Sequence, residues 1–181
     1  MKSPKILLFL FLFQIHDAHL DAYLDYKSPF HPTISKNGMV VSQNLESSEI
    51  GTMILESGGN AVDAAVAVGF SLTTTLPRAG NIGGGGFMLV YIKETEELFS
   101  IDYRSRSSLN SNLKDLFGSK SPAQIQDDDY DLTKYDYKAS AVPGTVYGLL
   151  EAHERFGDLP LEKVLQPVID QARNGIIVSY D

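Results

Sequence analysis

The chain has 181 residues, of which 43% are apolar, and this length and composition predict a single globular domain with a sizeable core. The formal net charge of −8 comes without any basic run, which argues on electrostatic grounds against nucleic acid as a partner. Cysteine is absent from the sequence, which excludes disulfide bonds and thiolate chemistry.

Residues 1–22 have the pattern of a secretory signal peptide. Two lysines precede an apolar run, Ile6 to Phe13, that is too short to cross a bilayer. Cleavage is expected after Ala18 or Ala22, and an uncleaved N-terminal anchor is the alternative. We therefore expect a secreted or periplasmic protein with no stable membrane span beyond such an anchor.

The next part of the chain predicts an extended segment, a strand and a helix. Residues 23–37 contain two X-Pro pairs and form a lead-in to a domain at 38–181. Met39 to Ser42 has the composition of a short buried strand. Apolar residues at helical spacing between Leu45 and Leu55 then predict an amphipathic helix, which the pair Gly58-Gly59 ends.

A second helix is predicted from Ala61 to Leu72. Its sequence is apolar nearly all round, so we expect it to be buried. Asn60 can accept a hydrogen bond from the first free amides, and Asp63 places a carboxylate near the positive end of the helix dipole. We assign Asp63 this capping role in preference to a catalytic one.

Four consecutive glycines, Gly83 to Gly86, precede an apolar strand. Each glycine costs chain entropy and supplies no side chain, so something must lie against bare backbone there. Phe87 follows where a P-loop needs lysine, and Met88 stands where the dinucleotide motif needs its third glycine, so a nucleotide cofactor is disfavoured. Close packing of two layers and a ligand site stay open as interpretations.

Two strands, Phe87 to Lys93 and Leu98 to Arg104, predict a hairpin with the acidic loop Glu94 to Glu97. Side chains alternate between the two faces of a strand. This alternation places Arg104 on the same, more polar face as Asp102.

From Ser105 to Lys138 the sequence is polar. The clustered carboxylates at 127–131 lack the alternating spacing and the glycine of a calcium loop. We interpret them as a solvated loop and predict no metal site.

The last third predicts two helices. The first runs from Thr145 to Phe156, and the second begins at Pro160 and is expected to be kinked or divided at Pro167. His153, among charged neighbours on the first of these helices, is expected to face solvent. Ile176 to Val178 begins a further strand, so the chain has the pattern of a domain that is incomplete at its C-terminus.

Several separated blocks together carry a resemblance to a known family. In order, these blocks resemble the large-subunit half of gamma-glutamyltransferases, the glutathione hydrolase family of N-terminal-nucleophile hydrolases. The likeness spans about Lys36 to the end of the chain. The blocks are Asn60-Ala61-Val62-Asp63-Ala64-Ala65-Val66-Ala67, Pro77 to Met88, Ile101-Asp102-Tyr103-Arg104, Pro143-Gly144-Thr145, Pro160-Leu161 and Ala172-Arg173-Asn174-Gly175.

The resemblance implies an α+β fold, the four-layer αββα architecture of N-terminal-nucleophile hydrolases, with only its N-terminal part in this chain. It also implies a self-cleaved precursor, whose new N-terminal Thr transfers the γ-glutamyl group of glutathione to water or to an amino acid or peptide acceptor. The implied partner is the small subunit of the same precursor, and no cofactor is needed. The family's Thr-Thr-His triplet is absent and Leu76 follows Thr73 to Thr75, so we assign no catalytic residue to this chain.

By the same resemblance, Arg104 matches the arginine that grips the α-carboxylate of the γ-glutamyl group. A planar guanidinium can hold a carboxylate through two parallel charge-assisted bonds. Family members follow this arginine with Glu, a small residue and Pro, whereas Ser105 to Ser108 stand here, with Arg106 as a competitor for the role. The alternative for Arg104 is a surface side chain paired with Asp102 or with a neighbouring acid.

Two other functions stay open. One is a related secreted acylase of the cephalosporin-acylase kind, and the other is a non-enzymatic or degenerate secreted fragment. Retention of Arg104 favours a γ-glutamyl substrate, and a Thr-Thr-His block downstream of Asp181 would favour the enzyme.

Overall fold

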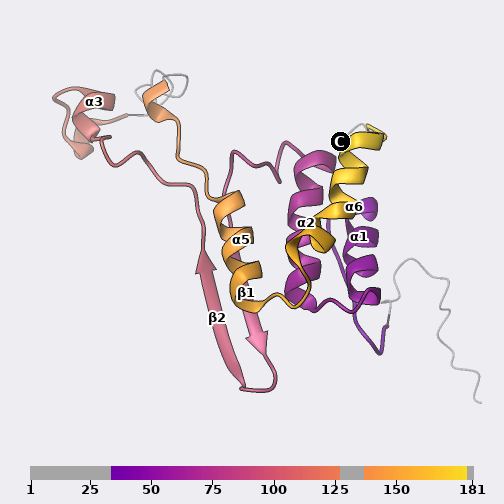
Figure 1. Ribbon diagram of the computed structural model, residues 1–181. Helices are drawn as coiled ribbons and strands as arrows, with labels where there is room; N and C mark the ends of the chain where they lie inside the picture. The colour runs from indigo at the N-terminus through magenta and orange to yellow at the C-terminus, as the bar shows by residue number, and fades with distance from the viewer. Residues whose placement is uncertain (1–33, 127–136, 179–181) are drawn as a thin grey trace, which may run out of the picture. The chain divides into compact units, whose positions relative to one another are not determined.

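The computed structural model describes residues 34–126 and 137–178. The predicted signal peptide, nearly all of the lead-in and the carboxylates at 127–131 lie outside these residues. No helix in the described ranges combines the length and apolarity needed to cross a membrane. The elements, drawn in Figure 1, are α1 (Leu45–Glu56), α2 (Ala61–Thr75), β1 (Phe87–Ile92), β2 (Glu97–Asp102), α3 (Leu113–Phe117), two 3₁₀ turns (Pro122–Gln124 and Tyr137–Ala139), α5 (Thr145–Phe156) and α6 (Leu161–Asn174), all within the compact unit Asn37–Asp181.

Helices α1 and α2 begin at asparagine caps. The Asn44 side chain accepts a hydrogen bond from the Ser47 amide at 3.0 Å, which satisfies one of the free amides of α1. Helix α1 ends before Gly58, which adopts a positive φ of 91° that favours glycine. Asn60 caps α2 in the same way, as the sequence predicts.

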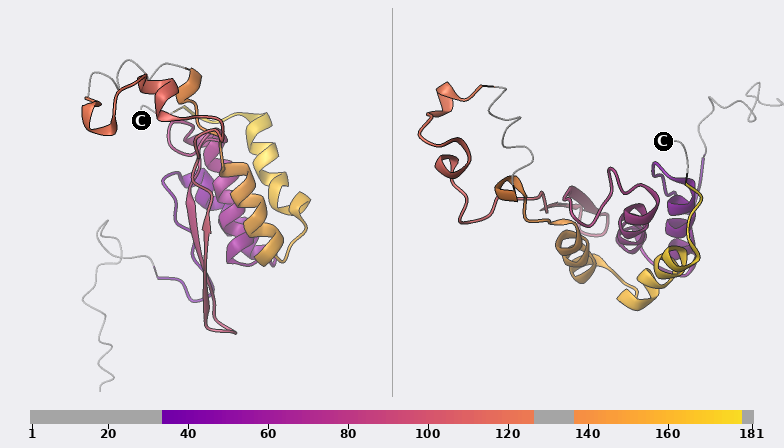
Figure 2. Two further views of the ribbon diagram at one scale, coloured as in Figure 1. Left: turned by 90° about the vertical axis from the view of Figure 1, so that its left-hand side faces the viewer. Right: turned by 90° about the horizontal axis from the view of Figure 1, so that it is seen from above.

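Helix α2 is the central helix of the unit. It contacts α1, α5 and α6, and the right panel of Figure 2 shows these three helices around it. It continues to Thr75, three residues beyond the predicted end, because the Thr75 hydroxyl bonds to Ser47 and to the Ser71 carbonyl. The core of the described residues consists of Ile50, Ile54, Val62, Ala64, Val66, Ala67, Val90, Ile101, Leu149, Ala152, Val164 and Val168.

The hairpin β1–β2 is antiparallel, with Phe87 opposite Asp102 and Ile92 opposite Glu97. Its loop is therefore Lys93–Glu96, one residue earlier than predicted. Val90 and Ile101 lie on the buried face against the helices, which confirms the predicted alternation. The opposite face exposes large apolar side chains, namely Phe87, Leu89, Tyr91 and Leu98.

Two predicted strands are wrong. Met39 to Ser42 and Ile176 to Val178 belong to no strand, and Val41 and Ile177 are 81% and 88% exposed. A strand needs a neighbour for its backbone groups, and β1–β2 is the only sheet among the described residues. The apolar composition of these segments was therefore not sufficient to form strands.

Helix α6 is continuous through Pro167, so of the two outcomes expected at this residue, a kink or a division, the division is wrong. Proline removes one backbone hydrogen bond from a helix interior. Val164 and Val168, on the turns either side, are buried in the core. We infer that this packing compensates for the missing bond.

Candidate functional site

The end of the glycine run packs against the segment that leaves β2. Gly86 and Tyr103 exchange two backbone hydrogen bonds, of 3.3 and 3.1 Å, which extend the hairpin pairing. A Cβ atom on Gly86 would lie 2.8 Å from the Tyr103 ring, and one on Gly85 would overlap the backbone of Tyr103 and Ser105. At these two positions the bare backbone is required by the chain's own packing, which is the first of the two interpretations offered above.

Tyr103 is also in contact with the start of α5. A Cβ atom on Gly144 would overlap the Tyr103 backbone, and one on Gly148 would overlap the Tyr103 ring. Tyr103 is half-buried between these glycines and Gly86, and its burial raises the pKa of the phenol. Three glycines from two distant segments of the chain therefore pack closely against Tyr103, the residue that precedes Arg104.

Backbone hydrogen bonds join the same segments. The Gly84 carbonyl accepts from the amides of Gly144 at 2.8 Å and Thr145 at 3.2 Å. On the far side of Arg104, Arg106 and Val142 exchange bonds of 3.1 and 2.7 Å. The segment Tyr103–Arg106, which we call the arginine loop, is thus fixed at both of its ends.

Arg104 is exposed and lines a hollow of about 370 Å³. Asp102 Oδ1 accepts a hydrogen bond from the Arg104 amide at 3.0 Å, so this carboxylate orients the backbone of Arg104. In residues 34–126 and 137–178 the Arg104 guanidinium forms no ion pair, so the alternative pairing with Asp102 is not formed. The hollow is lined by Asp102, Tyr103, Arg104, Arg106, Val142, Pro143, Gly144 and Tyr147.

Sequence reasoning missed the part of Tyr103 and Tyr147 in this hollow. The sequence around each tyrosine has no unusual feature, and the two residues come to line the same hollow only in the folded chain. The Pro143-Gly144-Thr145 block was a usable signal, because a glycine just before a helix can mark a close approach of backbone.

Substituting Gly148 with alanine should destabilise the protein by roughly 1–2 kcal/mol, although alanine is the better helix former. The new methyl group would overlap the Cβ and Cγ atoms of Tyr103, which cannot move without the backbone. Gly84→Ala is the matched control, because its Cβ would meet neighbours at an ordinary 3.5 Å. Urea unfolding of both variants checks this; equal stability would contradict the close packing against Tyr103.

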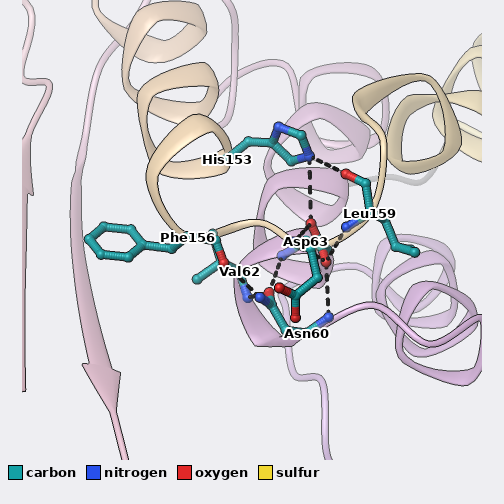
Figure 3. Close-up of polar contacts among 7 residues, drawn as sticks. Asn60, Val62, Asp63, His153, Phe156 and Leu159 are labelled. Atoms are coloured by element: carbon teal, nitrogen blue, oxygen red, sulfur yellow. Dashed lines mark hydrogen bonds and ion pairs between the residues drawn. The ribbon is translucent and has the colours of Figure 1, made fainter. Parts of the chain in front are cut away.

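A second polar cluster surrounds Asp63, which is fully buried (Figure 3). Its Oδ2 atom accepts backbone hydrogen bonds from Asn60 at 2.9 Å, Asp158 at 3.1 Å and Leu159 at 3.2 Å. The bond from Asn60 completes a capping box, and the other two join the start of α2 to the α5–α6 turn. All three partners are backbone amides, which favours the structural role assigned to Asp63.

The expectation that His153 faces solvent is wrong. Its side chain is 14% exposed, and its Nε2 atom lies 2.8 Å from the Leu159 carbonyl and 3.6 Å from Asp63 Oδ1. The α5–α6 turn supplies the Leu159 carbonyl, and α2 supplies the Asp63 carboxylate. The charged neighbours of His153 in sequence gave no sign of this tertiary contact.

Two other kinds of site can be assessed in the described ranges. Thr73 and Thr75 use their hydroxyls in hydrogen bonds within α2 and to α1, which suits a structural role. Across residues 34–126 and 137–178, no group of three or more His, Cys, Asp or Glu side chains is placed to hold a metal ion.

Comparison with known proteins identifies relatives of the chain. The profile of the gamma-glutamyltranspeptidase family matches residues 47–181. The glutathione hydrolase proenzyme of Escherichia coli K12 is 43% identical over 150 residues, which cover 83% of this chain and 25% of that protein. The acylase ACY 1 proenzyme of Pseudomonas sp. V22 is 34% identical over 160 residues, covering 86% of this chain and 28% of that protein.

A solved structure agrees with these sequence matches. The gamma-glutamyltranspeptidase of Helicobacter pylori superposes with a TM-score of 0.70 at 35% identity, covering 81% of this chain and 40% of that one. Such neighbours confirm the predicted α+β class and the αββα fold of N-terminal-nucleophile hydrolases, of which the described elements form a part. The chain spans about a quarter of the length of the curated relatives it matches.

Proposed function

The chain belongs to the gamma-glutamyltranspeptidase family, and on this premise we propose that the protein containing it transfers the γ-glutamyl group of glutathione to water or to an amino acid acceptor. The catalytic group in this proposal is a Thr at an N-terminus made by self-cleavage, supplied from outside residues 1–181. Its hydroxyl attacks the γ-amide carbonyl while its α-amine takes the proton, and an acyl-enzyme forms as the amine leaves. Water or an acceptor amine then releases the acyl group.

The proposed contribution of this chain is Arg104, which binds the α-carboxylate of the γ-glutamyl group. The observation that carries the proposal is an arginine on a loop fixed at both ends, at the edge of a hollow, with no ion pair among the described residues. A guanidinium in this state is available for a ligand, and its fork matches a carboxylate. Gripping one end of the substrate would leave the γ-amide free to reach the hydroxyl.

A second candidate is an amide acylase that acts on other acyl groups. The match to an acylase proenzyme, which covers nearly the same part of the chain, favours it. Such a substrate need not carry an α-carboxylate, so Arg104 would then have no role in binding it. The N-terminal pattern supports a further proposal, that the protein is exported before it acts.

Hydrolysis of two substrates by the full-length protein tests these alternatives. One substrate is glutathione, and the other is an acyl amide that lacks the α-carboxylate and the α-amino group. We expect a preference for glutathione of at least about a hundredfold in kcat/KM, since the acyl amide offers Arg104 nothing to bind. Equal rates would favour the acylase, and a self-cleaved protein inactive on both would favour the non-enzymatic alternative.

A further inference from the structure

The hollow beside Arg104 contains a second guanidinium. Arg106 is exposed and lines the same hollow as Arg104, together with Gly144, which precedes α5, and Tyr147 in its first turn. Both arginines belong to one short loop, and the second of them lies in the stretch Ser105 to Ser108, which departs from the family pattern noted above. The hollow thus offers two binding groups for anions where the family pattern supplies one.

These two positive charges are not neutralised within the described part of the chain. Neither guanidinium forms an ion pair there. Among residues 34–126 and 137–178, Asp102 is the one acidic residue that lines the hollow, and its Oδ1 atom already accepts the Arg104 amide hydrogen. A concave site that carries more positive than negative charge attracts anions, most strongly those with two negative charges.

The spacing of the two arginines sets the kind of ligand that can use both. Arg106 is fixed through its own backbone by the pair of bonds to Val142, so its position does not depend on its side chain. In an extended chain, the Cα atoms of residues i and i+2 lie about 7 Å apart. The two carboxylates of a γ-glutamyl amino acid are separated by a chain that spans on the order of 9 Å when extended.

We propose that Arg106 binds a second carboxylate of the acyl donor, the one on the amino acid attached to the γ-amide. Arg106 is then a specificity-determining residue that selects γ-glutamyl amino acids over neutral γ-glutamyl amides. This inference rests on the proposed function, because it requires Arg104 to hold the α-carboxylate. The competing arrangement, in which Arg106 helps Arg104 to hold one carboxylate, makes a different prediction for neutral donors.

The test compares γ-glutamylglycine with γ-glutamylglycinamide, which differ only in the second carboxylate, on the full-length protein. We expect the wild type to show a KM about tenfold lower for the carboxylate donor. A charge-assisted hydrogen bond at an exposed site contributes a binding free energy at the low end of the range for such bonds. Arg106→Ala should raise the KM of γ-glutamylglycine about tenfold. It should raise the KM of the amide by clearly less, because the amide lacks the second carboxylate, and Arg106→Lys should fall between Arg106→Ala and the wild type for γ-glutamylglycine.

The outcomes separate this inference from the proposed function. Arg104→Ala should raise the KM of both donors alike, because both carry the α-carboxylate. If Arg106→Ala weakens both donors equally, or neither, the second-carboxylate role is overturned while the proposed function stands. If the self-cleaved wild type hydrolyses neither donor, both proposals are overturned together.

Discussion

Replacing Arg104 with lysine should raise the KM for a γ-glutamyl donor by roughly ten- to a hundredfold in the full-length protein, with little change in kcat. Lysine keeps the positive charge but loses the planar fork that can hold both oxygens of a carboxylate. The loop itself should be unaffected, because its ends are fixed by the backbone of Tyr103 and Arg106. Steady-state kinetics with γ-glutamylglycinamide, which does not involve the proposed Arg106 contact, measures this effect alone.

The controls for this prediction are a stronger variant and a distant one. Arg104→Ala should raise the KM further, since charge and fork are both lost. Arg155→Lys changes another exposed arginine, which pairs with Glu151 and stacks on Phe156 away from the hollow, and should leave the KM unchanged. Gel analysis should find normal self-cleavage in all three variants. An unchanged KM in Arg104→Ala would remove this residue from the substrate site.

Local signals in the sequence were sufficient for the longer helices α1, α2, α5 and α6 and for the hairpin, whereas the short helix α3 was not predicted. Asn60 caps α2 and Gly58 follows the end of α1, as predicted, because these features depend on residues within one or two turns. The reciprocal bond from the Asn60 amide to Asp63, which completes a capping box, was not predicted. The alternation in β1 and β2 was also readable, since one face of the hairpin is buried and the other is not.

Features that depend on distant segments were not predictable in the same way. Met39 to Ser42 has the apolar composition of a strand, but pairing requires a neighbour that composition cannot specify. His153 has charged neighbours in sequence, yet the α5–α6 turn covers it. The predicted strand is absent because no neighbouring strand pairs with it, and His153 is covered because a distant segment packs on it. Tertiary contacts thus override the local sequence pattern in both cases.

The binding role of Arg104 stays a prediction, which rests on the motif around it. The glycine run indicated a close approach of backbone, but not which group approaches. The structure shows that the approaching group is Tyr103 of the same chain, and that Gly144 and Gly148 also pack against it. No pattern in the sequence indicated this contact. The glycines therefore act on the proposed binding site indirectly, by fixing the loop that carries the arginine.

Replacing Asp63 with alanine should have the largest effect on stability, a loss of roughly 2–4 kcal/mol in the free energy of unfolding. The variant removes the shared acceptor of three backbone amides, those of Asn60, Asp158 and Leu159. It also removes the carboxylate beside His153 and leaves a small cavity at a fully buried position. The start of α2 and the α5–α6 turn should both loosen, because this one carboxylate joins them.

Hydrogen exchange of the full-length protein locates that effect, and urea unfolding measures its size. The amides of Asp158 and Leu159 should exchange faster in Asp63→Ala, and Asp63→Asn should fall between the variant and the wild type, since its amide keeps one acceptor oxygen. Asp170→Asn is the matched control: Asp170 is exposed on α6 and accepts from Gln166, so its loss should change stability by less than about 0.5 kcal/mol. If Asp63→Ala were no more costly than this control, the carboxylate would not be the link between α2 and the turn, and the packing of Val164 and Leu149 against α2 would have to hold α5 and α6 in place alone.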